Sequence, residues 1–238
     1  MNGKTLVVVQ CWAGDIARVN TALEQYVHHG LPVLLLSPED SQACIEHPLI
    51  ICRSAGPNAY NDETSVHRYL AQLRALVEYD YDWFLLNESD SFCLSSQLPD
   101  FIYEDEEVVW SNYAIPRGWM ELNHEPDVEA AMVVHDTAMQ APWFLSHRAL
   151  ERMVSIDEAA WDDCPSYARF IDWWFHTATH RAGLRHEDYG KYGTTWPIVG
   201  LWGAACVRPD ILGGAIMIHA VKDHEALGAV LEAYSESR

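Results

Sequence analysis

Short apolar runs alternate with longer amphipathic stretches through the first half of the chain. Thr5–Gln10 is a nearly continuous apolar run, which is typical of a strand buried on both faces of a parallel sheet. From Asp15 to His29 apolar residues recur at helical spacing, and Gly30 is a helix stop signal. The same alternation continues with strands predicted at Pro32–Leu36, at Leu49–Cys52 and from Trp83, and a helix at about Glu63–Tyr79.

This strand, helix, strand order predicts an α/β fold with a mainly parallel central sheet and helices on both faces. In such sheets ligands bind beyond the carboxyl ends of the strands. Polar or aromatic residues stand at three of these ends, namely Cys11-Trp12, Glu39-Asp40 and Glu88–Asp90. We therefore expect a binding site at this edge of the sheet.

The second half is less regular and contains a loop-rich stretch at Asn112–Pro126. We find no internal repeat and no flexible linker, so one domain over residues 1–238 is predicted, with a binding half (1–111) and a second half (112–238). The elements expected here are strands at Glu107–Ser111 and Ala131–His135, helices at Ser146–Val154 with a Ser cap and at Ser166–Ala182 before Gly183, apolar segments at Trp196–Ala205 and Ala215–Ile218, and a helix from His224.

The most informative stretch is the apolar run Trp83–Leu86, which leads into two carboxylates, Glu88 and Asp90. On an extended chain side chains two residues apart share a face, so both would project together from the strand end. Two hard oxygen ligands there suit Mg²⁺ or Mn²⁺, and such an ion can hold a diphosphate. The alternative is an acidic turn that caps a following helix.

Composition limits the classes of function. The 238 residues are 49% hydrophobic and include 10 Trp, which is enough for a well-packed core. With 35 acidic and 15 basic residues, the formal charge of −20 disfavours nucleic acid and anionic membranes as partners. We see no signal peptide, no apolar run approaching the ~20 residues that span a bilayer, and no Cys-x-x-Cys pair among the six cysteines. Reduced cysteines and a cytoplasmic location are expected.

The order of these elements and of three motifs along the chain resembles that of GT-A-fold glycosyltransferases, which use nucleotide sugars. Glu88-Ser89-Asp90 after an apolar strand resembles the acidic metal motif of the family, usually Asp-x-Asp. Ala141–Met153 looks like its strand-to-helix element. Ile171–Phe175, followed by Ala182–Leu184, resembles the element that holds the catalytic base in many inverting members. The resemblance spans most of the chain and implies a single GT-A-like, Rossmann-like domain.

The sequence departs from the family pattern at three points. Glu88 replaces the first Asp of the acidic motif, which a metal site tolerates. Ile171 replaces the usual Glu before Asp172, and Ala141-Pro142 stands where small Gly residues are common. These departures leave the subfamily and the stereochemical outcome open.

The resemblance implies a Mn²⁺ or Mg²⁺ ion bound by Asp90, with Glu88 and His219 as further candidate ligands. It implies Asp172 as the general base of an inverting transfer, and Lys222 as a partner for phosphate charge. Each assignment has a structural alternative: a capped turn for the acidic pair, a hydrogen-bonded core or surface histidine, a helix-surface carboxylate and a solvated lysine.

Other residues near strand ends and loops are candidates for contacts with nucleotide and sugar, because they carry rings, hydrogen-bonding groups or positive charge. Taken singly, each of these residue types more often has a structural role. The candidates are Gln10 and Trp12 for the base, Glu39 and Asp40 for ribose hydroxyls, Arg53 and Arg68 for phosphate, and Trp119 and Trp173 for the acceptor side.

The expected activity is transfer of a sugar from a nucleotide sugar, a UDP-sugar by family majority, to an acceptor hydroxyl. The acceptor stays open among a glycan, a small molecule and a modified DNA base, and the net charge weighs against DNA. A nucleotidyltransferase of related fold is one alternative, although Gly14 stands alone and no Gly-rich phosphate loop follows the first strand. A non-catalytic nucleotide-sugar-binding protein is another.

Overall fold

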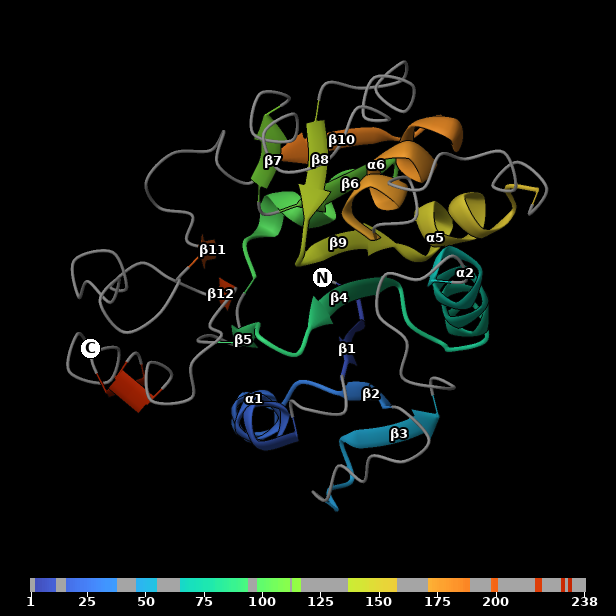
Figure 1. Ribbon diagram of the computed structural model, residues 1–238. Coiled ribbons are helices and arrows are strands. Elements are labelled where there is room, and N and C mark those ends of the chain that lie inside the picture. The colour runs from blue at the N-terminus through green and yellow to red at the C-terminus, as the bar shows by residue number, and fades with distance from the viewer. Residues whose placement is uncertain are drawn as a thin grey trace.

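The computed structural model describes residues 3–11, 16–37, 46–54, 65–93, 98–111, 113–116, 137–157, 171–188, 198–200, 217–219, 228–229 and 231–232. Its centre is a seven-stranded sheet in the order β10-β6-β9-β4-β1-β2-β3 (Figure 1). Only β9 runs antiparallel to its neighbours, so the predicted mainly parallel sheet is confirmed. The strands are β1 (Thr5–Gln10), β2 (Val33–Ser37), β3 (Ile50–Ser54), β4 (Trp83–Glu88), β6 (Val108–Ser111), β9 (Trp143–Ser146) and β10 (Arg185–Asp188).

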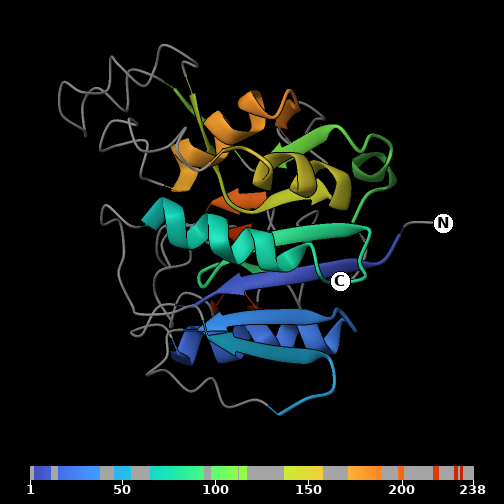
Figure 2. The same ribbon diagram turned by 90° about the vertical axis from the view of Figure 1, so that its right-hand side faces the viewer.

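Helices cover both faces of this sheet, as the sequence predicts (Figures 1 and 2). Side chains along β1 alternate between two cores: Val7 and Val9 pack on the side of Tyr26, and Leu6 and Val8 pack on the opposite side. The first core contains α1 (Ile16–His28), and the second contains α2 (Ser65–Leu76), α5 (His147–Val154) and α6 (Ile171–Arg181).

The predicted helix ends are confirmed at two glycines and one serine. Gly30 and Gly183 have φ of 71° and 67°, a left-handed conformation that glycine adopts without steric cost. The residue after each glycine closes the helix: Leu31 N–H donates to the Tyr26 carbonyl and Leu184 N–H to the Thr179 carbonyl. At the start of α5, Ser146 Oγ accepts a hydrogen bond from Ala149 N–H at 2.9 Å.

Several short strands differ from the sequence predictions. Tyr113–Pro116 (β7) pairs with Thr137–Gln140 (β8), so part of the expected loop is strand. The strand predicted at Ala131–His135 lies outside the described residues. β10 is an edge strand of polar sequence, Arg-His-Glu-Asp, which shows no apolar run. A separate three-stranded sheet, in the order β11-β12-β5, joins β11 (Ile198–Gly200), β12 (Met217–His219) and β5 (Phe92–Cys93).

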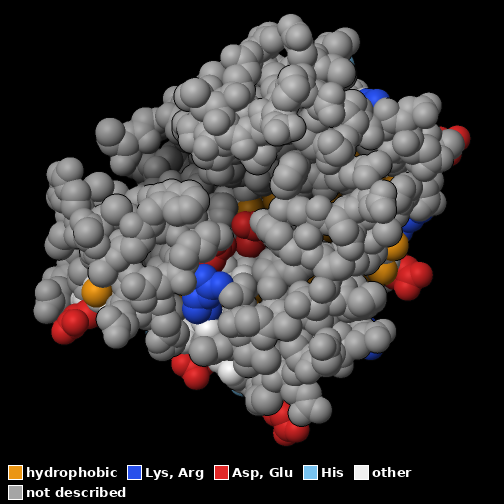
Figure 3. Space-filling model, in the orientation of Figure 1, with side chains coloured by type: hydrophobic (Ala, Val, Ile, Leu, Met, Phe, Trp, Pro, Cys, Tyr) orange, Lys and Arg blue, Asp and Glu red, His pale blue; other side chains and the backbone are white. Residues whose placement is uncertain are grey.

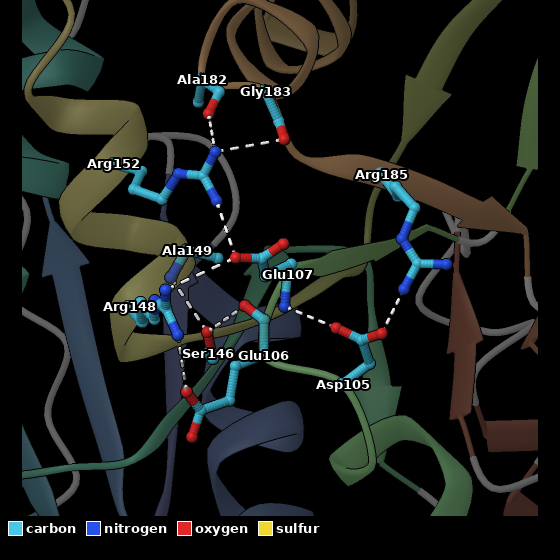
Figure 4. A network of polar contacts seen from close by, with 10 residues as sticks. All are labelled: Asp105, Glu106, Glu107, Ser146, Arg148, Ala149, Arg152, Ala182, Gly183 and Arg185. Carbon is cyan, nitrogen blue, oxygen red and sulfur yellow. Dashed lines mark hydrogen bonds and ion pairs between the residues drawn. The ribbon is translucent and has the colours of Figure 1, made fainter.

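A network of ion pairs and hydrogen bonds lies where β6 and β10 begin (Figure 4). Arg152 of α5 donates to the carbonyl oxygens of Ala182 and Gly183, at 2.5 and 3.1 Å, and to Glu107 Oε1 at 3.2 Å. Arg185 pairs with Asp105 nearby. This network ties α5, the end of α6 and the start of β6 together at the amino edge of the parallel strands.

Two further findings concern the cysteines and membranes. None of the described cysteines forms a disulfide: Cys11 and Cys93 are buried, and Cys52 is exposed. None of the described helices has the length and apolar character that a bilayer crossing requires.

Candidate active site

The carboxyl ends of four neighbouring strands form one row across the sheet. Glu88 of β4 is in register with Gln10 of β1, Gln10 with Leu36 of β2, and Leu36 with Arg53 of β3. Figure 2 shows these strands ending on one side of the molecule, which is the side that faces the viewer in Figures 1 and 3. Near the centre of this face acidic side chains are visible with basic ones beside them (Figure 3).

The chain turns sharply after Glu88. Ser91 N–H donates to the Glu88 carbonyl at 3.1 Å, which closes a β-turn with Ser89 and Asp90 at its centre. The prediction that Glu88 and Asp90 lie on one extended segment is therefore wrong, because the chain must leave the main sheet here to form β5. The helix-capping alternative is also wrong, since a strand follows the turn. We call residues Glu88–Ser91 the acidic turn.

The two carboxylates of the acidic turn differ in burial. Asp90 is only 2% exposed, whereas Glu88 is half-buried. Proteins retain a buried carboxylate where it is paired, hydrogen-bonded or bound to a cation. Asp90 is thus the more buried carboxylate of the acidic turn, and it lies at the carboxyl edge of the sheet.

The acidic turn rests on α1. Tyr26 is fully buried, and its Oη accepts a hydrogen bond from Asn87 Nδ2 at 2.7 Å and donates to the Ser91 carbonyl at 3.3 Å. Burial raises the pKa of Tyr26 well above its ordinary value, with a further contribution from Cys93, against a smaller lowering by the Asn87 hydrogen bond. The phenol therefore keeps its proton at neutral pH.

The strand after the acidic turn brings a distant segment to it. Phe92 and Cys93 of β5 pair antiparallel with Ile218 and Met217 of β12. Continuing this register by one residue sets the backbone of His219 opposite Ser91, next to Asp90. The sequence candidate for a third metal ligand is thus a backbone neighbour of the acidic turn; its side chain lies outside the described set.

The helix α6 reaches the same edge of the sheet. Only residues 182–184 separate α6 from β10, which begins opposite Val108, so α6 ends at the amino edge. With 11 residues the helix is roughly 16 Å long, and its start lies toward the carboxyl edge. There the Phe175 ring stacks on Trp143, with centroids 4.5 Å apart, and Trp143 pairs with Leu86. The backbone of Asp172 is one turn before Phe175.

Two candidates for nucleotide binding make contacts within the protein. Gln10 is 8% exposed, and its Nε2 donates to Gln72 Oε1 of α2 at 2.6 Å. Arg53 is exposed and donates to Tyr79 Oη at 3.4 Å, a hydrogen bond that raises the pKa of the Arg53 guanidinium. Arg53 lies three strand spacings from Glu88, roughly 14 Å. In this arrangement it points to Tyr79 and not to the acidic turn.

The side chains of the remaining candidates fall outside what the structure describes. For Arg68, Asp172, Trp173 and His219 it gives the backbone position in α2, α6 or β12 and nothing of the side chain. The candidates outside the described residues altogether are Trp12, Glu39, Asp40, Trp119 and Lys222.

The donor atoms of the acidic turn fit a divalent ion of the magnesium type. Among the described side chains no three His, Cys, Asp or Glu groups gather closely enough to hold a metal. Mg²⁺ is commonly held by one or two carboxylates together with substrate phosphates and water. Glu88 and Asp90 suit that mode, and a third protein ligand would come from a side chain that is not described.

A second polar cluster lies between α6 and β10. Ser111 Oγ and His186 Nε2 share a hydrogen bond of 2.8 Å, and the rings of His186 and His176 lie 5.3 Å apart. His176 is 7% exposed, whereas His180, one turn later in α6, is exposed. The two helix histidines therefore differ in burial, and the buried ring of His176 contacts that of His186.

No protein-family model and no curated protein matches the chain. Among solved structures, the apo WbbM bifunctional glycosyltransferase aligns with a TM-score of 0.57 and 10% sequence identity, over 100% of this chain and 50% of that one. The chain has a GT-A-like fold. It spans about half the length of the WbbM chain, and at this identity the likeness concerns the fold alone.

Two further solved structures align with this chain. One is a glycosyltransferase involved in the glycosylation of the major capsid of PBCV-1, with a TM-score of 0.49 and 13% identity over 98% of both chains. The other is the galactosyltransferase LgtC in complex with donor and acceptor sugar analogues, with a TM-score of 0.49 and 10% identity over 98% of this chain and 94% of that one.

The sequence prediction missed the buried groups beneath the acidic turn, Tyr26, Asn87 and the Ser91 carbonyl. One signal was present. Asn87 is a polar residue directly after a fully apolar run, and a buried amide needs a hydrogen-bonding partner. Nothing in the sequence identifies Tyr26 of α1 as that partner, because the contact depends on how the helix packs on the sheet.

Proposed function

We propose that this chain is a metal-dependent glycosyltransferase that moves a sugar from a nucleoside diphosphate sugar, a UDP-sugar, to an acceptor hydroxyl. The observation that carries the proposal is the acidic turn at the carboxyl end of β4, with buried Asp90, within a GT-A-like fold. The pairing of β5 with β12 beside this turn supports it, because the same register, continued by one residue, would set the backbone of His219 opposite Ser91.

In the proposed reaction the acceptor oxygen bonds to the anomeric carbon of the sugar. The bond from that carbon to the diphosphate breaks, and the acceptor proton passes to the Asp172 carboxylate, with inversion. Asp90, Glu88 and His219 would hold Mn²⁺ or Mg²⁺, which when bound would neutralise the leaving diphosphate. The position of the Asp172 backbone near the carboxyl edge is compatible with this role.

The other contacts belong to the same proposal. Gln10, in register with Glu88, is near enough to the acidic turn to meet the nucleotide, whereas Arg53 would first have to leave Tyr79. We also propose that residues 1–238 act as one domain. The further assignments are Trp12 for the base, Glu39 and Asp40 for the ribose, Arg68 and Lys222 for phosphate, and Trp119 and Trp173 for the acceptor side.

The acceptor is a glycan, a small molecule or a modified nucleobase. A formal charge of −20 opposes approach of DNA, so we place DNA last. If DNA is the acceptor after all, transfer must depend on a local basic surface. The affinity for DNA would then fall steeply between 50 and 200 mM salt, by roughly 10³-fold or more for about six to ten phosphate contacts.

A thermal-shift panel of nucleotide sugars, with and without Mn²⁺, tests the proposal without knowledge of the acceptor. One donor at about 100 times its dissociation constant should stabilise the protein by about 2.7 kcal/mol, a rise in Tm of roughly 5–10 °C, only when Mn²⁺ is present. The Asp90→Asn variant should lose this shift. Slow Mn²⁺-dependent hydrolysis of the same donor would support catalysis.

Other results point to other functions. A Mn²⁺-dependent shift without any hydrolysis or transfer identifies a nucleotide-sugar-binding protein. Release of pyrophosphate from a nucleoside triphosphate identifies a nucleotidyltransferase. No shift with any nucleotide sugar would contradict the proposal.

A further inference from the structure

One side chain of α1 holds both ends of the acidic turn. Asn87 directly precedes the turn, and its Nδ2 donates to Tyr26 Oη at 2.7 Å. Ser91 ends the turn, and its carbonyl accepts from the same Oη at 3.3 Å. A single phenol oxygen therefore connects the residue before Glu88 with the residue after Asp90.

These hydrogen bonds are shielded from water. Tyr26 and Ser91 are 0% exposed and Asn87 is 2% exposed, so solvent cannot replace a lost partner. The anchor itself is firmly placed. The Tyr26 carbonyl accepts from Leu31 N–H at 2.9 Å in the motif that ends α1, and the ring packs in the core with Val7 and Val9. The position of α1 is thus transmitted to the acidic turn.

We propose that Tyr26 is a positioning residue for the metal and diphosphate site: by tying Asn87 to Ser91, it holds Glu88 and Asp90 where both can serve one ion. The inference rests on the proposed function, since it takes the acidic turn as the metal site. Groups that orient metal ligands through hydrogen bonds commonly change metal affinity or activity 10–100-fold when they are removed. The phenol suits this task because, with its pKa raised by burial, it stays neutral and donates to the Ser91 carbonyl.

The test compares two phenol deletions in the same core. Tyr26→Phe removes the oxygen beneath the acidic turn. Tyr103→Phe removes an oxygen that shares a 3.4 Å hydrogen bond with Thr5 Oγ1, at the start of β1 and the opposite edge of the sheet. The readouts are the dissociation constant for Mn²⁺ from titration, the concentration of Mn²⁺ that half-saturates donor hydrolysis, and Tm. Both variants should lose some stability.

Only Tyr26→Phe should weaken Mn²⁺ binding, raising the dissociation constant by about 10–100-fold. The dissociation constant of Tyr103→Phe should stay within about twofold of wild type. If Tyr26→Phe does not fold, Asn87→Leu is the substitute, because it removes one of the two hydrogen bonds. It should also weaken Mn²⁺ binding. Equal weakening in both phenol variants would overturn the inference, because it would reflect general loosening of the core.

Asp90→Asn separates this inference from the proposed function. Suppose that Asp90→Asn no longer binds Mn²⁺, whereas folded Tyr26→Phe binds it with wild-type affinity. The acidic turn is then the metal site, and Tyr26 does not position it. If Asp90→Asn binds Mn²⁺ like wild type, the proposed metal site is wrong, and the role of Tyr26 is overturned with it.

Discussion

Asp90 and Glu88 differ in their surroundings although they share one turn, and Asp90, 2% exposed, is the more sensitive position. Replacing Asp90 by Asn keeps the shape and removes the charge that a metal ligand needs. We expect Mn²⁺-dependent turnover to fall by more than about 100-fold in steady-state assays. The matched control is Asp80→Asn, at a carboxylate whose side chain is 98% exposed and pairs with Lys4. Equal activity in both variants would contradict the metal assignment.

Asp172 allows a test that separates proton transfer from metal binding. Asp172→Asn should lower kcat by about 10²–10⁴-fold, because general base catalysis contributes that much. The dissociation constant for Mn²⁺ should not change, since Asp172 is not one of the proposed ligands. Rates and metal titrations on the same preparation check both statements. Near-wild-type turnover in a folded variant would remove Asp172 from the mechanism.

Tyr26 also makes the free energy of unfolding depend on pH in the alkaline range. Its pKa is higher in the folded than in the unfolded protein, where it is near 10. The folded state then retains a proton that the unfolded state loses, so this contribution is fully present below pH 10 and is lost as the pH rises above it. The loss is up to about 1.4 kcal/mol per pH unit. Urea unfolding at pH 9, 10 and 11 should show a steeper decline for wild type than for Tyr26→Phe, and parallel declines would contradict it.

At the scale of elements, the sequence predicts long, strongly patterned segments well. β1, β2, β4 and the helices α1 and α5 lie close to their expected ranges, because burial on both faces or one apolar face leaves a periodic pattern. β10 and β5 leave no such pattern: β10 is a polar edge strand, and β5 has two residues. Their existence depends on neighbouring strands that provide hydrogen bonds, which the local sequence does not encode.

Arg152 and Arg148 offer a matched pair of arginines on α5. Arg152 binds the Ala182 and Gly183 carbonyls at the end of α6, whereas Arg148 is 60% exposed and pairs only with Glu106 and Glu107, at 4.0 and 3.5 Å, among the described contacts. Arg152→Met should lower the free energy of unfolding by about 1–2 kcal/mol, and Arg148→Met by less than about 0.5 kcal/mol.

Denaturant unfolding measures both changes in the free energy of unfolding. Mn²⁺ affinity should stay at the wild-type value in both variants, because this network (Figure 4) lies where β6 and β10 begin, whereas the acidic turn follows the opposite, carboxyl end of β4. Equal destabilisation by the two substitutions would show that the carbonyl contacts of Arg152 carry no special weight.

For the whole molecule, the candidate site draws on three parts of the chain: the acidic turn after β4, the end of β12 and the start of α6. The first could be predicted, since an apolar run that ends in carboxylates is a local signal. That Tyr26 supports the turn could not, because helix-to-sheet packing decides it. The sequence pattern predicts an extended segment in place of the turn, since nothing local indicates that the chain leaves the main sheet after Glu88.

The proximity of β12 to the acidic turn leads to a last prediction. The strand β12 has three residues, and its pairing with β5, continued by one residue, would set His219 opposite Ser91. If His219 is a ligand, His219→Gln should lower the affinity for Mn²⁺ by about 10-fold or more. His28→Gln, at an exposed position near the end of α1, is the control and should bind Mn²⁺ like wild type.

Thermal unfolding of the metal-free protein distinguishes a ligand from a structural histidine. A ligand contributes only when the ion is present, so His219→Gln should lower Tm in Mn²⁺ and leave the metal-free Tm nearly unchanged. If His219 has a structural role, His219→Gln would lower Tm equally with and without Mn²⁺. In that case β12 would support the acidic turn through its backbone alone, and the two carboxylates, with water and diphosphate, would complete the ion's coordination.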